Sequence, residues 1–275
     1  MMSNIFEKFS LAGRTAVVTG GAGLLGRQFT MTLAQAGATV FVADLDHSAA
    51  QTQAESINQA GWKAFGLQVD VTDRVSVKTM VDKVVNETGR LDVIINNAAI
   101  DPKFEPRDFS GSDRDSFETY PLKTWQDSLN VNLTGMFLVA QAAVVPMINQ
   151  AQGVIINICS TYGLVGPDQS IYDIPGEPRK FKPVDYSVTK AGVLGFTHYL
   201  AAYYAGTRIR VNALSPGGVY NEHGEGFVKN YSARTILGRM ANIDEMNGAI
   251  LFLASDASSY MTGSNLVVDG GWTAW

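Results

Sequence analysis

Short runs of apolar and β-branched residues alternate along the chain with longer segments whose apolar positions repeat at helical spacing. The predicted strands are Thr15–Thr19, Thr39–Asp44, Lys63–Asp70, Leu91–Asn96, Val154–Ile158, Arg208–Leu214 and Asn265–Val268. Several of them, such as the one containing Val93-Ile94-Ile95, are continuously apolar. Such runs are typical of strands that are buried on both faces of a parallel sheet.

The intervening segments read as helices, because apolar residues recur three or four positions apart, as from Val77 to Val85 and from Leu129 to Met147. Regular alternation of strand and helix predicts an α/β fold, a doubly wound Rossmann-type parallel sheet of about seven strands with helices on both faces. Two polar stretches, Asp101–Lys123 and Pro167–Pro183, follow the carboxyl ends of predicted strands, where ligands bind in such sheets.

Length and composition fit one α/β domain over residues 1–275, with 46% hydrophobic residues and a formal net charge of -5. The negative charge argues against nucleic acid or an anionic membrane as a partner. Cys159 is the only cysteine and the three histidines are widely spaced, so we expect no disulfide and no metal site. Neither a signal peptide nor a membrane span is recognisable, which predicts a cytoplasmic protein.

The first predicted strand runs into a glycine-rich turn, Thr19-Gly20-Gly21-Ala22-Gly23-Leu24-Leu25-Gly26, and then into a helix. Glycines there let the backbone approach a pyrophosphate, whose charge is met by free N–H groups at the helix N-terminus. Asp44 ends the second predicted strand, where a carboxylate accepts hydrogen bonds from the adenosine ribose and repels a 2′-phosphate. No Arg or Lys close in sequence would bind that phosphate, so we predict NAD rather than NADP.

Tyr186 and Lys190 are four residues apart in a predicted helix, Val184–Tyr204, so both side chains project from one face. An ammonium beside a phenol favours the phenolate and lowers its pKa from an ordinary value of about 10. The pair therefore suits proton transfer to or from an alcohol oxygen. By itself this spacing is also common on solvated helix faces. Other features of the chain must therefore show whether the pair is catalytic.

Seven features in order resemble the short-chain dehydrogenase/reductase family, over about Leu11 to Gly271. They are the glycine-rich turn, Asp70 after the third strand, Asn96-Asn97-Ala98-Ala99 after the fourth, Asn132, Ser160 after the fifth, the Tyr186/Lys190 pair, and Pro216-Gly217 after the sixth. The resemblance implies an NAD-dependent oxidoreductase that interconverts a secondary alcohol and a ketone. It also implies a homotetramer formed through helices at about 125–150 and 186–204.

The resemblance also implies a role for each matching residue. Tyr186 would be the general acid/base, Lys190 would lower its pKa and bind the nicotinamide ribose, and Ser160 would hydrogen-bond the substrate oxygen. Asn132 would hold a water that continues the proton path. The residues implied for NAD binding are Gly20, Gly23, Leu25, Gly26, Asp44, Asp70, Val71, Asn97, Ala98, Gly217 and Val219, together with Tyr186 and Lys190.

Four features of the sequence depart from the family pattern. The glycine spacing fits the extended branch, which includes nucleotide-sugar epimerases and dehydratases; Ala99 replaces a glycine; and Asn221 replaces a threonine. Ser160 and Tyr186 are 26 positions apart, about twice the usual interval. The glycine spacing leaves open an epimerase or dehydratase that uses bound NAD transiently. A dinucleotide-sensing protein without catalysis is a third alternative, although such proteins usually lack the Tyr/Lys pair.

Residues 101–123, 167–183 and 220–239 are expected to rim the mouth of the site. They are rich in charged and hydrogen-bonding groups, namely Asp101, Lys103, Glu105, Arg107, Asp108, Arg114, Tyr120, Asp168, Tyr172, Arg179, Asn221, Glu222 and His223. A steroid or acyl-chain pocket would show more Leu, Met and Phe. We therefore favour a polyhydroxylated, sugar-like small-molecule substrate. The alternative is that these loops are solvated and face away from the site.

Overall fold

The computed structural model describes residues 4–101, 116–177 and 180–275. Seven parallel strands form one sheet in the order β3-β2-β1-β4-β5-β6-β7. The strands are β1 Thr15–Thr19, β2 Thr39–Asp44, β3 Ala64–Gln68, β4 Val93–Asn96, β5 Gly153–Ile158, β6 Ile209–Pro216 and β7 Asn265–Val268. The predicted doubly wound sheet is therefore confirmed.

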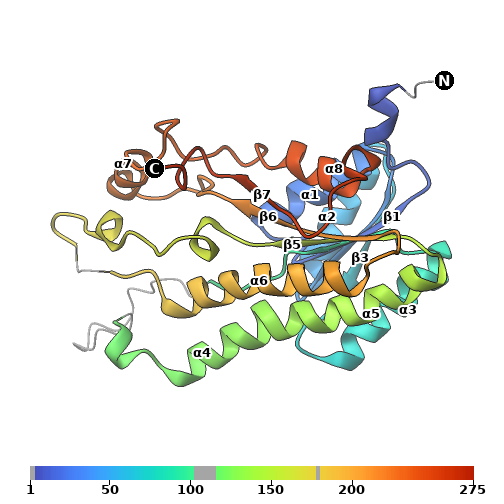
Figure 1. The fold of residues 1–275 in the computed structure, drawn as a ribbon, viewed down its shortest axis with the longest axis horizontal. Helices are drawn as coiled ribbons and strands as arrows, with labels where there is room; N and C mark the ends of the chain where they lie inside the picture. The colour runs from blue at the N-terminus through green and yellow to red at the C-terminus, as the bar shows by residue number, and fades with distance from the viewer. Residues whose placement is uncertain (1–3, 102–115, 178–179) are drawn as a thin grey trace.

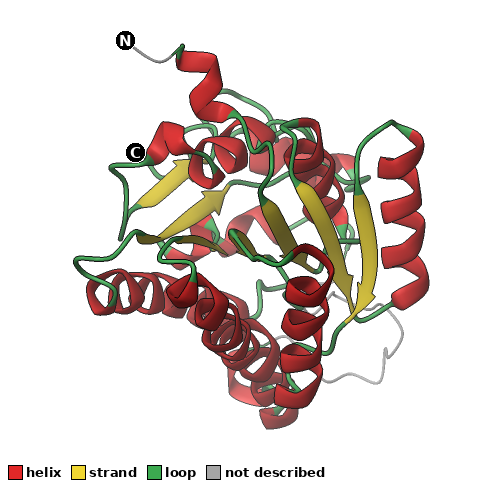
Figure 2. Ribbon diagram, turned by 90° about the vertical axis from the view of Figure 1, so that its right-hand side faces the viewer, coloured by secondary structure: helices red, strands yellow, loops and turns green. Residues whose placement is uncertain are grey.

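Helices cover both faces of the sheet (Figure 1). One face carries α1 (Leu24–Gln35), α2 (His47–Gln59) and α8 (Asn247–Ala254), and the other carries α3 (Arg74–Thr88), α4 (Leu122–Leu129), α5 (Met136–Asn149) and α6 (Val184–Tyr203). Figure 2 shows the twisted strands between these two layers. α7 (Glu225–Ser232) follows β6, and short 3-10 turns span Ile5–Phe9, Phe117–Thr119, Thr161–Gly163, Gln169–Tyr172 and Asp256–Ser258.

The sheet is buried because each helical layer packs an apolar stripe against it. Phe29 and Ile250 belong to the core cluster on one face, and Met80 and Met147 belong to the cluster on the other. The central strands β1, β4 and β5 are buried along their whole length, as their continuous apolar runs predict.

A π-helix, Asn130–Gly135, joins α4 to α5 into one long helix. By length and composition alone this helix, Leu122–Asn149, could cross a membrane, which corrects the expectation that no segment has that character. Half of its most apolar window is buried inside the protein, and the helix packs against α3 and α6. Packing in the core therefore accounts for the buried half of its apolar residues, whereas Phe137, Val145 and Ile148 remain exposed.

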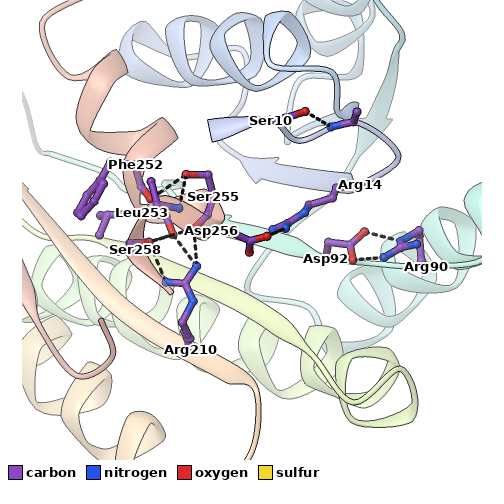
Figure 3. A network of polar contacts seen from close by, with 12 residues as sticks. Ser10, Arg14, Arg90, Asp92, Arg210, Phe252, Leu253, Ser255, Asp256 and Ser258 are labelled. Carbon is purple, nitrogen blue, oxygen red and sulfur yellow. Dashed lines mark hydrogen bonds and ion pairs between the residues drawn. The ribbon is translucent and has the colours of Figure 1, made fainter. Parts of the chain in front are cut away.

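A network of polar contacts lies at the end of the sheet where the strands begin (Figure 3). Arg210 of β6 donates hydrogen bonds to the Leu253 and Ser255 carbonyls, which end α8, and to Ser258 Oγ. Burial lowers the pKa of this guanidinium. These contacts satisfy carbonyls that a helix end leaves without partners, so this edge serves the stability of the fold.

The strand order reverses between β1 and β4, so the loops that leave these two strands run in opposite directions. In an open parallel sheet this reversal opens a crevice at the carboxyl ends of the strands. The predicted site residues follow these strand ends, which places them together although they are distant in sequence.

Candidate active site

A cavity of about 690 Å³ lies along the carboxyl ends of the strands. Residues from six strand ends line it, namely Gly20 after β1, Asp44 of β2, Asp70 after β3, Asn97 after β4, Ser160 after β5 and Gly217 after β6. The structure thus brings together most of the residues predicted from the sequence. The members that line the cavity are Gly20, Gly23, Leu25, Asp44, Asp70, Val71, Asn97, Ala98, Ser160, Tyr186, Lys190, Gly217 and Val219.

The glycine-rich turn packs so closely that side chains would not fit at several of its positions. Gly20 has φ 60°, and a Cβ there would lie 2.9 Å from the Ala98 Cα. Gly26 does not line the cavity; a Cβ on it would lie 2.1 Å from the Gly20 carbonyl oxygen. Gly26 therefore lets α1 pack against the turn, while Gly23, the N-cap of α1, faces the cavity. This places the N-terminus of a 12-residue helix at the cavity, as an anion site requires.

Asp44 is held at the end of β2 by two backbone groups. Its Oδ2 accepts a hydrogen bond from Ala22 N at 3.0 Å, and its Oδ1 accepts one from Asp46 N at 3.2 Å. The carboxylate is thereby tied to the glycine-rich turn while it lines the cavity. Asn97 fixes the same turn from the other side, because its Nδ2 donates to the carbonyls of Thr19 and Gly20.

Tyr186 and Lys190 project from α6 toward the cavity. Lys190 Nζ lies 5.7 Å from the centroid of the Tyr186 ring and donates a hydrogen bond to the Ile158 carbonyl at 2.9 Å. Burial lowers the pKa of Lys190 to about 8. Burial raises the pKa of Tyr186 above its usual range and the charge of Asp101 adds to that effect, whereas a hydrogen bond with Ser160 opposes it. Burial is the largest cause, so the pKa of Tyr186 is raised in this structure and not lowered as the Tyr/Lys spacing predicts.

Asn132 lies behind the cavity, and its side chain does not line it. It sits in the π-helix between α4 and α5, a local irregularity that is frequent at functional sites. Its Oδ1 accepts from Ile100 N at 2.8 Å, and its Nδ2 donates to the Ile100 carbonyl and to Thr189 Oγ1. Asn132 therefore ties the segment after β4 to α6, one residue before Lys190.

The end of the cavity beyond Tyr186 combines an aromatic wall with polar groups. The wall consists of Tyr162, Tyr172, Phe227, Tyr231 and Met240, and the polar groups are Asp101, Lys182, Asn221 and His223. Burial raises the pKa of each of the three tyrosines of this wall, that of Tyr231 to about 12, so they face the cavity as neutral phenols.

The rim predicted from the sequence is only partly found at the cavity. Asp101, Tyr172, Asn221 and His223 line it, whereas Tyr120, Asp168 and Glu222 do not. The remaining predicted rim residues, Lys103, Glu105, Arg107, Asp108, Arg114 and Arg179, lie outside the described residues. The 167–183 segment does reach the site, so the alternative that it faces away is wrong for Tyr172 and Lys182.

Sequence reasoning named Tyr172 but missed the rest of the aromatic wall. Phe227 and Tyr231 are four residues apart on α7, which is the spacing of two side chains on one helix face and the only signal that could have indicated them. Tyr162 and Met240 carry no such pattern. Within the described ranges, no group of three His, Cys, Asp or Glu side chains is arranged to hold a metal ion.

Comparison with known proteins identifies the family. Residues 21–273 match the short-chain dehydrogenase/reductase model described as "Enoyl-(Acyl carrier protein) reductase". The chain is 35% identical to a 3-oxoacyl-[acyl-carrier-protein] reductase of Thermotoga maritima, over 95% of this chain and 98% of that one. It is 36% identical to a trans-4-hydroxycyclohexanecarboxylate dehydrogenase of Sinomonas cyclohexanicum, over 99% and 97%.

Among solved structures, the chain is similar to a gluconate 5-dehydrogenase of Burkholderia cenocepacia in complex with NADP and tartrate. The TM-score is 0.86 and the identity 30%, over 99% of this chain and 100% of that one. The chain therefore belongs to the short-chain dehydrogenase/reductase family. It is an oxidoreductase that uses a nicotinamide dinucleotide and acts on a small-molecule alcohol or ketone.

Proposed function

We propose that this protein is an NAD-dependent dehydrogenase that interconverts a secondary alcohol and a ketone. The observation that carries the proposal is the convergence of Ser160, Tyr186 and Lys190 in the cavity that the glycine-rich turn and Asp44 also line. The glycine-rich turn and Asp44 would hold NAD, which would supply the hydride acceptor for the alcohol carbon. Tyr186 takes the alcohol proton in that direction and returns it in the other, while Ser160 holds the substrate oxygen.

Lys190 binds the nicotinamide ribose and favours the Tyr186 phenolate in this proposal, and the proton path continues toward Asn132. The buried position of Lys190, 5% exposed, and its bond to the Ile158 carbonyl support a fixed rather than a mobile ammonium. The contact of Asn132 with Thr189 supports a link between this residue and the helix that carries Tyr186.

The carboxylate of Asp44 supports NAD over NADP. It is fixed by Ala22 N and Asp46 N, so it cannot turn away from a 2′-phosphate without losing both hydrogen bonds. One structural relative binds NADP, so similarity alone leaves the choice open. Initial rates with each dinucleotide test the proposal, and an equal or better kcat/KM with NADP would refute it.

The polar groups beyond Tyr186 favour a polyhydroxylated, sugar-like substrate. Asp101 accepts hydrogen bonds and Lys182, Asn221 and His223 offer further polar contacts, which suits a ligand with several hydroxyl groups. The gluconate 5-dehydrogenase relative is consistent with this class. The aromatic wall supports a second candidate, a cyclic alcohol, which agrees with the hydroxycyclohexanecarboxylate dehydrogenase relative.

The experiment is NADH production with a panel of polyols, sugar acids, nucleotide-sugars and cyclic alcohols, run beside Tyr186→Phe. We expect turnover on at least one class and a loss of about a hundred- to ten-thousandfold in the variant, since general acid–base catalysis contributes that much. Conversion of a nucleotide-sugar without net NADH would instead indicate an epimerase or dehydratase. Tight NAD binding with silence across the panel would favour a dinucleotide sensor.

We also propose that the protein is a cytoplasmic homotetramer. Apolar and aromatic side chains are exposed along α5 and α6, namely Phe137, Val145, Ile148, Val188, Tyr199 and Tyr203. These two helices lie side by side on one face of the protein (Figure 1), and exposed apolar side chains along them favour self-association. Light scattering that gives a monomer at micromolar concentration would refute the assembly.

A further inference from the structure

Lys182 lies over the ring of Tyr186, closer than Lys190 does. Its Nζ is 3.9 Å from the Tyr186 ring centroid, against 5.7 Å for Lys190 Nζ. The Lys182 side chain is only 11% exposed, and its ammonium pairs with Asp101 at 2.5 Å. Tyr186 therefore has two cations beside it, one from its own helix and one from the segment that precedes the helix.

The long segment between Ser160 and Tyr186 holds Lys182 in this place. Gln169 clamps its backbone, because Gln169 Oε1 accepts from Lys182 N at 2.8 Å and Gln169 Nε2 donates to the Lys182 carbonyl at 3.3 Å. Gln169 begins a 3-10 turn whose Ile171 and Tyr172 are buried in the aromatic cluster. The position of Lys182 is thus set by packing and not by a solvated loop.

We propose that Lys182 is a positioning residue that, with Lys190, stabilises the phenolate of Tyr186. The inference rests on the proposed role of Tyr186 as the acid–base group. A cation on the ring face is attracted by the aromatic electrons, and more strongly when the ring carries negative charge. Lys190 is farther away and is engaged by the Ile158 carbonyl, which leaves Lys182 as the nearer source of positive charge.

Several other groups face Tyr186 from the elements packed around it. Cys159, Ser160 and Tyr162 come from the end of β5 and the turn after it, Tyr172 from the segment after that turn, Lys190 from α6, and Asp101 from the segment after β4. Among these, Asp101 is an anion that raises the pKa of Tyr186. Burial lowers the pKa of His223, and the charge of the nearby Lys182 adds to that effect.

The ion pair explains why Lys182 matters for the proton affinity of the phenol. With Lys182 present, the charge of Asp101 is balanced at 2.5 Å. Without Lys182, the charge of Asp101 would be unbalanced beside Tyr186. Among the described residues, Lys190 would then be the one cation left near the ring. Removal of Lys182 should therefore raise the pKa of Tyr186, and a guanidinium at the same position should restore it.

The first test is the pH dependence of kcat/KM for alcohol oxidation in Lys182→Met, Lys182→Arg and Lys180→Met. We expect Lys182→Met to move the acid limb to higher pH by about one unit, the lower end of the effect of an opposite charge at this distance. Lys182→Arg should return the limb toward its original position. Lys180, which pairs with Glu177 in the same segment, is the matched control and should leave it unmoved.

The second test does not depend on finding the substrate. Tyrosinate absorbance is titrated with NAD bound, and the contribution of Tyr186 is taken as the difference from Tyr186→Phe. The Tyr186 transition should move to higher pH in Lys182→Met, even if every alcohol in the panel proves inactive. If Lys182→Met does not fold, Lys182→Gln removes the same charge and is titrated in its place.

Two outcomes would overturn the proposal. One is an unmoved Tyr186 titration in the folded charge-removing variant. The other is a rise in KM with kcat and both pH profiles unchanged, which would make Lys182 a substrate contact only.

Discussion

Lys190→Met should make the free protein more stable at neutral pH and inactive as a dehydrogenase. The Lys190 ammonium is 5% exposed and has been transferred from water into the interior beside Tyr186. Burial lowers its pKa from an ordinary 10.5 to about 8. A buried charge of this kind opposes folding, and the enzyme retains it because the proposed chemistry requires it.

The size and sign follow from linkage between proton binding and folding. Below pH 8 Lys190 is protonated in both the folded and the unfolded chain, so the full penalty is present. Between pH 8 and 10.5 the folded chain has lost the proton and the unfolded chain still holds it, so stability rises with pH. The whole pKa shift corresponds to a folding penalty of about 3 kcal/mol at neutral pH. This penalty has disappeared at pH 10.5.

Urea unfolding of wild type and Lys190→Met from pH 7 to pH 10.5 measures the effect. Loss of the hydrogen bond to the Ile158 carbonyl adds a term that does not depend on pH, so the change in the difference between the two proteins is the diagnostic quantity. We expect the stability advantage of the variant to shrink by about 3 kcal/mol across this range. Lys180→Met is the control for a half-buried lysine outside the cavity, and a constant difference for Lys190→Met would refute the reasoning.

Three further variants test other parts of the structure. Asp44→Ala should raise the NADP-to-NAD ratio of kcat/KM by at least about tenfold, because an anion beside the 2′-phosphate is removed; an unchanged ratio would contradict this. Gly26→Ala places a Cβ 2.1 Å from a backbone oxygen and should weaken NAD binding by at least about tenfold in calorimetry, whereas Gly166→Ala, in open space, should not. Arg210→Met should lower the free energy of unfolding by about 3 kcal/mol with kcat retained, while Arg14→Met, at a partly exposed pair, should lower it by less than about 1 kcal/mol.

The fold could be predicted closely because the hydrophobic pattern and the sheet depend on the same physical requirement. A strand covered on both faces must be apolar throughout, so β1, β4 and β5 stand out in the sequence. β3 and β7 are less buried, and their assignment relied more on the alternation of strands with helices. The long α4–α5 helix was harder to classify, because packing against α3 and α6 calls for the same residues as packing against lipid.

The placement of the glycine-rich turn and Asp44 at the cavity was predictable for a different reason. Backbone approach at Gly20 and hydrogen bonding at Asp44 are local demands that few residue types can meet. The substrate end obeys no such local rule. Its aromatic wall comes from four separate segments, and no local rule decides which side chain of each segment fills the space, so Tyr162 and Met240 leave no pattern in the sequence.

The doubled interval between Ser160 and Tyr186 illustrates how an insertion can be absorbed without loss of the site. A hydrogen bond joins these two side chains, because the segment departs after the 3-10 turn Thr161–Gly163 and returns at Pro183, the N-cap of α6. Its return is fixed by the Gln169 clamp, and that clamp carries Lys182 onto the Tyr186 ring. An insertion that only lengthened a loop would not need to bury two of its own side chains in the aromatic cluster, as Ile171 and Tyr172 are. The burial of these residues therefore argues that the segment is a structural part of the cavity wall, which fixes Lys182 over the ring of Tyr186.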